Sequence, residues 1–497
     1  MAKGLILYFD IDTGFYPGLH HGLAYLLGAV KQENDIDFMH IFKEEHITFA
    51  KNEIEGKQWD FVGVSFTTNQ KKFLRELLRI TDVSKQFFIA GGVHPTLDKE
   101  NIFKDFPQID GICIGEGEKP LLELCRRLDK GKDIYTTPSF WFKVSVQDIK
   151  EGKKRHRKKV VSNIVQNMVA PLVHIDKLPE PDYTIFDYKR IISDNADKFP
   201  MMLGRGCPYQ CAYCCNVAIS NNYSNKGEYT RFPSIRRSIE KIKNNLALYP
   251  RTQSIIFADD TFTVKKLWLH EFCKVYKYEI DLPFECNARV ETISDSVCED
   301  LKLAGCKSID FGVESGNEWL RRNILNRKHN NEIIVKAFET VHKHGIKAFA
   351  FNIIGMPFET REMMKDTFKL NKRLNAEYGR AFYYYPYPGT AMHEISLKLK
   401  IMQDNIENLT GYLEAPSVKE YFATHKDIRK YYNKLNLFFT VRIILSKLKL
   451  PKIIQTAILF FSQVLWQPLA SFHSQQSNRI IIAVRAKLKI FAIRYLR

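Results

Sequence analysis

Three cysteines on one short loop constrain this 497-residue chain more than any other feature. Cys207, Cys211 and Cys214 stand in a C-x-x-x-C-x-x-C spacing. Thiolates at this spacing can converge on one inorganic core, and a cubane iron–sulfur cluster normally takes four of them. Three ligands would leave one iron open, and an open metal position turns a structural site into a reactive one. Cys215 follows directly, but adjacent side chains point apart in most backbone conformations, so we interpret it as a neighbour of the ligands.

Other uses of cysteine fit the sequence less well. A structural zinc site usually pairs two C-x-x-C or Cys/His knuckles, and no second knuckle with that spacing occurs. Ten cysteines in 497 residues is a low density for a disulfide framework. The first residues, MAKGLILYFDID, are typical of a β-strand rather than a secretory signal. We therefore expect a reduced, cytoplasmic protein. Six lone cysteines lie on apolar or helical patterns and are interpreted as core residues: Cys113, Cys125, Cys273, Cys286, Cys298 and Cys306.

Residues 1–135 alternate short apolar runs with helical stretches. The apolar runs are Leu5–Phe9, Phe61–Ser65, Phe87–Ala90 and Gly111–Ile114. This alternation predicts an α/β domain with a doubly wound, Rossmann-like parallel sheet, whose ligands bind at the carboxyl ends of the strands. The loops expected there contain the candidate ligand contacts Thr67, Gly91, Gly92, His94, Gly115 and Glu116. Ordinary tight turns would explain the same glycines.

Residues 136–195 are predicted to form a connector between two domains. Phe140–Val146 and Val160–Ile164 can form a hairpin around a basic tip, which we interpret as a solvated turn. Paired prolines at Pro179 and Pro181 mark the boundary that follows.

Strand–helix alternation resumes over residues 196–400. Apolar runs recur at Ser254–Phe257, Ser308–Val313 and Ala348–Ile354, with helical stretches between them. Repeated β–α units of this length predict a closed or partly closed barrel of the TIM type. The cysteine loop follows the first expected strand, and such barrels keep their chemistry at the strands' carboxyl ends.

Residues 401–497 are predicted to form a mainly helical appendage with most of the chain's +18 charge. From Ile428 to Arg497 there are thirteen Lys or Arg and no Asp or Glu, so the preceding residues carry 61 basic against 56 acidic side chains. The apolar runs Leu437–Leu445 and Thr456–Leu465 fall short of the roughly 20 residues that cross a bilayer. Arg479–Arg497 mixes basic and apolar residues, which suits a helix on an anionic membrane surface. A helical bundle packed on the barrel is the alternative.

The cysteine motif and the segments after it resemble the radical S-adenosylmethionine (SAM) superfamily. The matching segments are Phe257–Phe262, Cys286–Arg289, Phe311–Gly316, Asn323–Arg327 and Ile353–Pro357. In this order they are similar to the branch with an N-terminal cobalamin-binding domain, which includes the anaerobic magnesium-protoporphyrin cyclase and the hopanoid C-methylases. The resemblance covers roughly residues 1–400 and implies a [4Fe-4S] cluster, SAM and cobalamin. The D-x-H-x-x-G motif of some cobalamin proteins is absent, which implies a cobalt without a protein histidine.

The resemblance assigns catalytic roles to three residues. Tyr213 matches the aromatic residue between two cluster ligands, whose ring can shield the cluster. Glu314 matches the acidic residue that contacts the ribose or amino group of SAM, because a carboxylate accepts strong hydrogen bonds from either. Arg289 is placed to pair with the methionyl carboxylate or with Glu314.

Three further residues match positions that hold SAM. Asp259 and Asp260 end an apolar strand, where paired carboxylates are costly unless they are hydrogen-bonded. They match the family's segment near the methionyl amino group. Gly355 matches the turn that contacts adenine.

The resemblance implies an enzyme that generates a 5′-deoxyadenosyl radical and C-methylates or otherwise modifies an unactivated carbon. The expected partners are a small-molecule substrate, which the apolar tail would suit if it were lipid-like, and an electron donor such as flavodoxin or ferredoxin. The expected location is the cytoplasm or the cytoplasmic face of a membrane. Cyclisation or another radical rearrangement is the alternative within the same cofactor class, and the sequence does not separate the two.

Two other function classes are weighed. Radical SAM enzymes that modify RNA carry further cluster cysteines in the N-terminal domain, whereas the first 200 residues here hold only Cys113 and Cys125, not in cluster spacing. A nucleic-acid partner is therefore not expected. A non-enzymatic cluster or cobalamin carrier would not need the full series of SAM-contacting segments.

Overall fold

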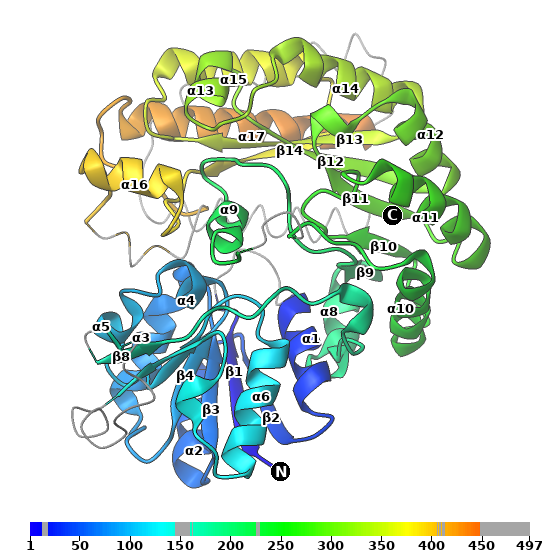
Figure 1. Ribbon diagram of the computed structural model, residues 1–497. Coiled ribbons are helices and arrows are strands. Elements are labelled where there is room, and N and C mark those ends of the chain that lie inside the picture. Colours follow the sequence, from blue (N-terminus) through cyan, green and yellow to red (C-terminus); the bar gives the residue numbers. More distant parts are fainter. Residues whose placement is uncertain are drawn as a thin grey trace.

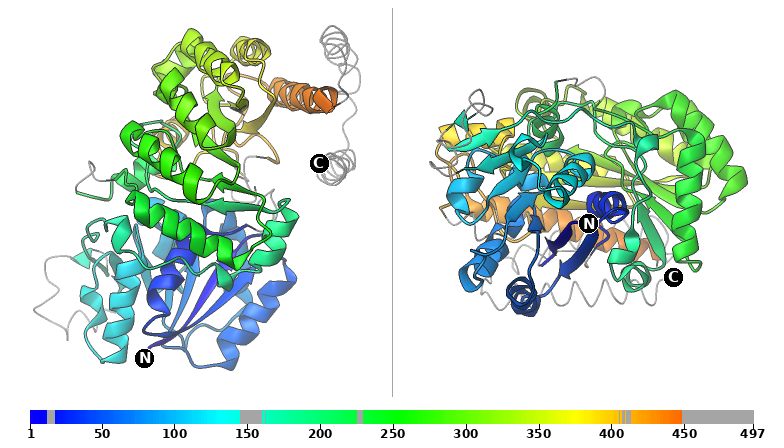
Figure 2. Two further views of the ribbon diagram at one scale, coloured as in Figure 1. Left: turned by 90° about the vertical axis from the view of Figure 1, so that its right-hand side faces the viewer. Right: turned by 60° about the horizontal axis from the view of Figure 1, so that its bottom comes forward.

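The computed structural model describes residues 1–447 apart from 12–17, 145–159, 162, 225–228, 405, 407–408 and 410–412, and it does not describe residues 448–497. Two α/β halves lie one above the other, and the carboxyl ends of the parallel strands in both halves point toward the region between them (Figure 1). The same two halves are seen from other sides in Figure 2. The predicted α/β fold class is confirmed.

The N-terminal half is built on an eight-stranded sheet in the order β2-β1-β3-β4-β5-β6-β8-β7. Its first five strands are parallel and are β1 (Lys3–Phe9), β2 (Asp35–Ile41), β3 (Phe61–Ser65), β4 (Phe88–Gly91) and β5 (Gly111–Cys113). Six helices connect or flank them: α1 (His21–Val30), α2 (Glu45–Gly56), α3 (Lys71–Ile80), α4 (Val93–Leu97), α5 (Ile102–Asp105) and α6 (Glu118–Asp129). β1 and β3 are buried almost throughout, because helices cover both faces of the sheet.

The predicted hairpin of the connector extends this sheet instead of standing apart. β6 (Phe140–Lys143) pairs antiparallel with β5 and with β8 (Ile164–Gln166), and β7 (Val160–Val161) pairs with β8. The prediction of one strand over Val160–Ile164 was wrong. Asn163 takes a left-handed conformation with φ of 63°, which reverses the chain between β7 and β8.

The second half is a curled half-barrel of six parallel strands in the order β14-β13-β12-β11-β10-β9. The strands are β9 (Lys198–Met201), β10 (Ser254–Phe257), β11 (Phe284–Ala288), β12 (Cys306–Glu314), β13 (Lys347–Ile354) and β14 (Tyr378–Tyr383). The main helices that follow these strands are α10 (Ile235–Leu248), α11 (Lys266–Glu279), α12 (Asp295–Leu303), α14 (Asn331–Lys343) and α15 (Arg361–Arg373). The partly closed form of the predicted barrel is therefore the one that the chain adopts.

Local signals set the bounds of the barrel helices. The side chains of Ser294, Asn330 and Thr360 accept a backbone N–H three residues on and so cap α12, α14 and α15. Gly345 follows α14 with φ of 65°, a left-handed conformation that ends a helix at little cost for glycine. Shorter helices complete this half: α8 (Tyr188–Asp194), α9 (Cys215–Ser220), α13 (Glu318–Asn323) and α16 (Ala391–Lys398).

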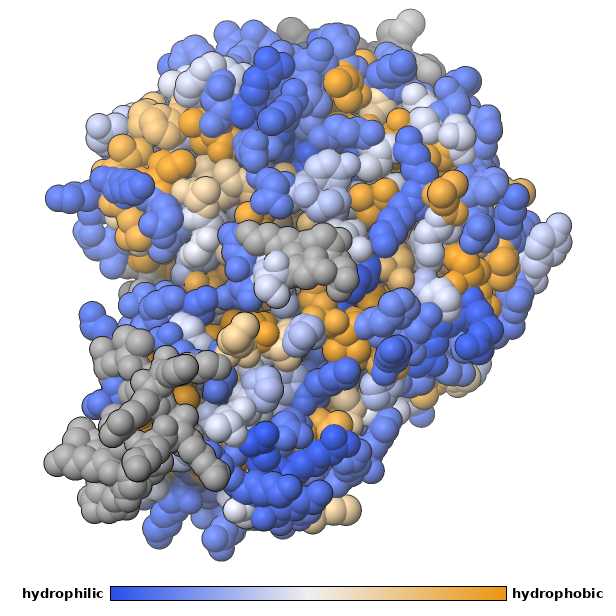
Figure 3. Space-filling model, viewed as in Figure 1, coloured by the Kyte–Doolittle hydropathy of each residue, from blue (hydrophilic) through white to orange (hydrophobic). Residues whose placement is uncertain are grey.

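One core continues from the first half into the second. Tyr183 lies between α1 and β9, because its ring packs edge-on against Phe199 at 5.7 Å and its hydroxyl lies 2.7 Å from His21 Nδ1. The backbone of Asp182 also donates to Ala24 of α1. Figure 3 shows hydrophobic residues along the middle of one face, between the two halves, and over α16, within a mostly hydrophilic surface.

The last described helix, α17 (His425–Lys447), closes the open edge of the half-barrel. It runs along β14 (Figure 1) and buries Leu435, Phe438 and Phe439 in the same core. The run Leu437–Leu445 thus packs on the barrel, whereas Thr456–Leu465 and Arg479–Arg497 lie outside the described residues. None of the described helices combines the length and the apolar character that a membrane span requires.

Asn436 of α17 hydrogen-bonds to the edge strand β14 on the side where no further strand of the described residues pairs with it. Its side chain accepts from the Ala381 N–H at 3.0 Å and donates to the Ala381 carbonyl at 3.3 Å. We expect Asn436→Ala to lower the free energy of unfolding by about 1–3 kcal/mol, because it leaves two part-buried backbone groups unsatisfied. Urea denaturation, with Asn433→Ala of the same helix as the control, measures the difference. Equal effects of the two substitutions would contradict this account of the edge.

Candidate active site

The predicted site residues lie at one edge of the half-barrel, where its parallel strands end. The cysteine loop follows β9, Asp259 and Asp260 follow β10, and Arg289 follows β11. Glu314 is the last residue of β12, and Gly355 follows β13. The carboxyl ends of adjacent parallel strands meet at the same edge, which brings residues from far along the chain together.

Asp259 anchors the start of the cysteine loop. Its two carboxylate oxygens accept the backbone N–H groups of Gly204 at 2.5 Å and Leu203 at 3.2 Å. The side chain is almost fully buried, and this burial raises the pKa of Asp259 to about 7 despite the two N–H donors. Asp259 therefore binds protein backbone here, whereas Asp260 beside it is exposed.

The three cysteines have different surroundings. Cys211 is buried, and its Sγ lies 2.9 Å from Nη1 of Arg289. Cys207 Sγ lies 3.6 Å from the Thr261 hydroxyl. Cys214 directly precedes α9, and Cys215 is the first residue of that helix.

This donor set fits a cluster better than a single ion. Among the described residues, no three His, Cys, Asp or Glu side chains stand close enough to hold one metal ion. A cubane offers a separate iron to each thiolate, so its ligands need not surround one point. Burial raises the pKa of Cys214 to about 12, and a coordinated metal is what deprotonates such a thiol.

Arg289 pairs with Glu291 and not with Glu314, which was one of its two predicted partners beside the methionyl carboxylate. Arg289 Nη2 donates to Glu291 Oε1 at 2.6 Å, and His329 Nδ1 lies 2.8 Å from the same oxygen. Burial alone would raise the pKa of Glu291, but His329 and Arg289 hold it well below its usual value. The Arg289 guanidinium also lies 3.9 Å from the ring centre of Tyr209. Strand order predicts which ends are near one another, but it does not predict which neighbour an arginine selects.

Glu314 pairs instead with Arg327, for which no role was predicted. The Tyr213 hydroxyl donates to Glu314 Oε1 at 2.7 Å, and Arg327 Nη1 reaches the same oxygen at 3.3 Å. Arg327 also donates to the Gly312 carbonyl at 2.5 Å, and its side chain is 4% exposed. Glu314 itself has φ of 66°, a left-handed conformation that ends the pairing of β12 and turns the carboxylate into the site.

Gly355 lies in a turn that is stabilised by Glu359, a second residue for which the sequence predicted no role. Glu359 Oε2 accepts the N–H groups of Gly355 at 2.6 Å and Met356 at 3.2 Å. Its other oxygen is buried and has no hydrogen-bond partner among the described residues. Burial raises the pKa of Glu359 to about 8. Gly355 has φ of 82°, which explains why this turn uses glycine.

This raised pKa predicts a pH dependence that Glu359→Gln should remove. Between about pH 4.5 and 8 the folded protein keeps a proton that the unfolded chain has lost, so the free energy of unfolding falls as the pH rises through that range. Glutamine keeps the acceptor oxygen and cannot ionise. Relative to wild type, the variant should gain a few kcal/mol of stability from pH 5 to pH 9.

Urea denaturation at pH 5, 7 and 9 measures this gain. Glu359→Ala is the control, because it removes the acceptor and should be less stable than Glu359→Gln at every pH. A constant difference between wild type and Glu359→Gln over this range would show that Glu359 is ionised throughout.

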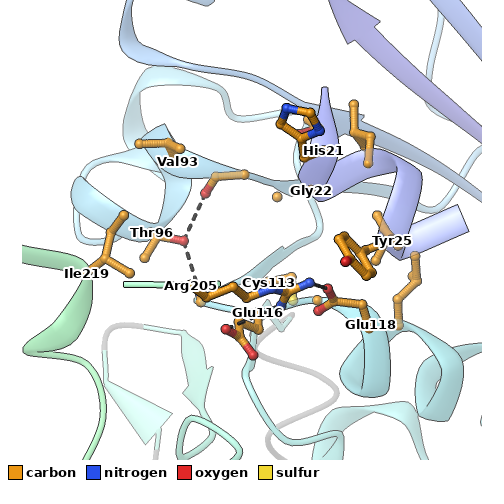
Figure 4. A pocket seen from close by; sticks show the side chains of 18 of the residues that line it. His21, Gly22, Tyr25, Val93, Thr96, Cys113, Glu116, Glu118, Arg205 and Ile219 are labelled. Carbon is orange, nitrogen blue, oxygen red and sulfur yellow. Dashed lines mark hydrogen bonds and ion pairs between the residues drawn. The ribbon is translucent and has the colours of Figure 1, made fainter. Parts of the chain in front are cut away.

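A cavity of about 300 Å³ lies where the two halves meet. Gly91, Gly92, Gly115 and Glu116 line it from the first half, and residues 202–206 line it from the start of the cysteine loop. The Thr96 side chain joins the two glycine loops, since it donates to the Gly92 carbonyl at 2.8 Å and accepts the Gly115 N–H at 3.0 Å (Figure 4).

Two predicted ligand contacts do not line this cavity. Thr67 is not among the lining residues, and His94 is fully buried with its Nδ1 3.1 Å from the Thr68 hydroxyl. The reason is that the chain enters α4 directly after Gly92, which turns the His94 ring toward Phe66 at 5.3 Å. His21 and Tyr25 of α1 line the cavity instead.

The lining fits a ligand that has both apolar and polar surfaces. Most of it is apolar and comes from residues such as Ile6, Ile89 and Phe140. The Tyr25 hydroxyl is buried without a hydrogen-bond partner among the described residues, and its side chain points into the cavity in Figure 4. An orphaned buried hydroxyl at a cavity wall is a group that a ligand can satisfy.

Comparison with known protein families assigns the two halves. Residues 201–370 match the radical SAM superfamily, and residues 15–125 match the B12 binding domain. The chain therefore contains a radical SAM domain and a B12-binding domain. The predicted resemblance to radical SAM proteins with a cobalamin-binding domain is confirmed. The cofactors of these two domains are a [4Fe-4S] cluster, SAM and cobalamin.

Several curated proteins are similar over most of their length. An uncharacterized methyltransferase of Pyrococcus horikoshii is 28% identical over 76% of this chain and 78% of its own. The bacteriochlorophyllide d C-8(2)-methyltransferase of Chlorobaculum tepidum is 24% identical over 77% of each chain. The anaerobic magnesium-protoporphyrin IX monomethyl ester cyclase of Rubrivivax gelatinosus is 23% identical over 60% of this chain and 51% of its own. Together with the two domains, these similarities identify the protein as an enzyme, a cobalamin-dependent radical SAM enzyme that methylates or otherwise modifies its substrate.

Solved structures show the same fold. The cobalamin-dependent SAM radical enzyme OxsB, with aqua-cobalamin and SAM bound, aligns with a TM-score of 0.66 and 16% identity over 94% of this chain and 72% of its own. The radical SAM methyltransferase TsrM from Kitasatospora setae aligns with a TM-score of 0.60 and 16% identity over 80% and 78%. At this identity the likeness concerns the fold.

Proposed function

We propose that this enzyme transfers a methyl group to an unactivated carbon of a small molecule. The observation that carries the proposal is the cavity between the halves, which the B12-binding domain and the cysteine loop line together. A shared cavity allows both cofactors and a substrate to meet out of solvent. Relatives that are named methyltransferases support the choice, among them the Pyrococcus and Chlorobaculum proteins.

In this proposal Cys207, Cys211 and Cys214 hold the cluster. When bound, the cluster supplies the electron that cleaves SAM, and cobalamin supplies a methyl carrier. The chain's own contribution is to hold these groups and exclude water. Arg289 donates to Cys211, and Asp259 fixes the backbone where the loop begins.

Glu314 is the proposed contact for the ribose or amino group of SAM. Among the described residues, both hydrogen bonds of its side chain go to Oε1, so Oε2 is the proposed contact atom. Tyr213 and Arg327 fix the carboxylate in place, and Arg327 compensates its charge. The turn at Gly355 is the proposed adenine contact, and Glu359 holds that turn. Asp260 is the proposed partner of the methionyl amino group.

Cyclisation of a substrate is the second candidate, because the relatives include anaerobic magnesium-protoporphyrin cyclases. The two reactions differ in their products. Methylation consumes one SAM as methyl donor, which leaves S-adenosylhomocysteine, and a second as radical source, which leaves 5′-deoxyadenosine. Cyclisation leaves 5′-deoxyadenosine without transfer of a methyl group.

The test uses protein reconstituted anaerobically with iron, sulfide and cobalamin. It is incubated with a reductant, SAM that carries a ¹³CD₃ methyl group, and a metabolite extract from cells that lack the protein. We expect 5′-deoxyadenosine, S-adenosylhomocysteine and a product with the labelled methyl group. Release of 5′-deoxyadenosine alone would favour cyclisation, and release of neither would overturn the proposal.

We also propose that the substrate is lipid-like, that the electron donor is a flavodoxin or ferredoxin, and that the C-terminal region contacts a membrane surface. The basic and apolar composition after Lys447 supports the membrane contact. Liposome flotation tests it with the full chain and a chain that ends at Lys447, which keeps α17 on the barrel. Equal flotation of the two chains would end the proposal of a membrane contact.

Labelled product in the lipid fraction of the extract would support a lipid-like substrate.

A further inference from the structure

One arginine of the cysteine loop reaches into the B12-binding domain. Arg205, two residues before Cys207, donates from Nη2 to Glu118 Oε1 at 2.5 Å, and its Nη1 lies 3.3 Å from Glu116 Oε1 (Figure 4). Glu116 also pairs with Arg231 of the barrel half. The exposed fractions of the four side chains are 16% for Arg205, 7% for Glu118, 21% for Glu116 and 11% for Arg231.

The backbone makes this junction stiff on the barrel side. Arg205 and Arg231 exchange backbone hydrogen bonds of 2.8 and 2.9 Å, so the two guanidinium groups are carried by one paired segment. The Arg205 guanidinium also lies 4.8 Å from the ring centre of Tyr25, which lines the cavity.

On the side of the B12-binding domain, the loop 115–118 is fixed by contacts with Tyr223. The backbone N–H of Glu116 donates to the Tyr223 hydroxyl at 2.8 Å, and a Cβ atom on Gly115 would come within 2.3 Å of that hydroxyl. Tyr223 follows α9, the helix that begins directly after Cys214. The loop 115–118 is therefore in contact with both ends of the cysteine segment.

The charges at this junction balance only when the two halves are in register. Two guanidinium groups from the barrel half face two carboxylates from the B12-binding domain, and a guanidinium keeps its charge at any physiological pH. A shift of one half against the other would leave these part-buried charges without their partners, which is costly. Buried ion pairs contribute little net stability compared with apolar residues, so a role in register explains them better.

We propose that Arg205 is a positioning residue that couples the two cofactor sites of this enzyme. A ligand in the cavity fixes loop 115–118, and through Arg205 this loop fixes the cysteine segment. A cluster on the cysteines fixes the same segment from its other end. This inference rests on the cysteine ligand set proposed above. Since coupling between two sites is reciprocal, each occupied site should strengthen binding at the other.

The test compares the affinity for hydroxocobalamin of cluster-free and cluster-loaded protein. In wild type we expect cobalamin to bind about fivefold or more tightly when the cluster is present. The ratio of the two affinities, with the cluster over without it, should fall toward one in Arg205→Gln and in Glu118→Gln. The double variant should lower this ratio no further than either single variant does. The midpoint potential of the cluster, measured with and without cobalamin, should shift in wild type and not in the variants.

Arg126→Gln is the matched control. It breaks an exposed Arg126–Glu33 pair inside the B12-binding domain, so the ratio should stay at the wild-type value. Arg205→Lys keeps the positive charge but lacks the planar group that bridges two carboxylates, so its ratio of affinities should be intermediate. This variant replaces Arg205→Gln in the test if Arg205→Gln does not fold.

The possible failures separate the two proposals. Wild-type protein that binds no iron would overturn the ligand set itself. Wild-type protein that holds both cofactors with a ratio of one, or variants that keep the wild-type ratio, would overturn the coupling role of Arg205 alone.

Discussion

Cys214→Ala should lose its cluster and cleave SAM about a thousandfold or more slowly, whereas Cys215→Ala should retain both properties. The two residues are adjacent and both are partly exposed, and each substitution removes a single thiol. Cys214 stands before the first residue of α9 with an extended backbone, while Cys215 is the first residue of the helix. Only the first is proposed to bind iron.

Iron and sulfide content, the visible absorption of the reconstituted protein, and the yield of 5′-deoxyadenosine measure the effect. Circular dichroism checks that both variants fold. Cys207→Ala and Cys211→Ala should behave as Cys214→Ala does. If Cys215→Ala lost iron and Cys214→Ala retained it, the assignment of the third ligand would be wrong.

The framework of this fold was predictable from the sequence because several of its parallel strands consist almost entirely of apolar residues. Such strands appear as continuous apolar runs, and the predicted runs Phe61–Ser65 and Ser254–Phe257 match β3 and β10 to the residue. The cysteine motif was equally clear, because three ligands within eight residues form a local signal. The helix boundary at Gly345 also depends on local conformation alone.

Tertiary contacts were not predictable in the same way. His94 was predicted to face a ligand from its position in a glycine-rich loop, but the short helix α4 turns its ring into the core. Glu116 was predicted to contact cobalamin, and its carboxylate is occupied by two arginines that follow about 90 and 115 residues later. The sequence contains each partner, but spacing does not show which charges meet across a domain boundary. Residue roles were therefore less predictable than residue positions.

The pairing of Glu314 with Arg327 leads to the second large effect. Arg327→Met should lower the free energy of unfolding by about 3–5 kcal/mol, because it leaves the part-buried Glu314 carboxylate without its counter-charge. It should also weaken SAM binding about tenfold or more, since the carboxylate keeps the Tyr213 hydroxyl but loses the charged donor that helps to fix its direction. Arg322→Met, an exposed arginine on the neighbouring α13, is the control and should change neither quantity measurably.

The double variant Arg327→Met with Glu314→Gln separates the structural role of the pair from its role in binding. Removal of both charges should recover most of the lost stability, because no unpaired charge remains buried. SAM binding should stay weak, because the neutral amide that replaces the Glu314 carboxylate does not offer a charged acceptor to the ribose or ammonium group. Urea denaturation and equilibrium dialysis with labelled SAM measure the two quantities separately. Recovery of both together would mean that Glu314 supports the barrel and does not contact SAM.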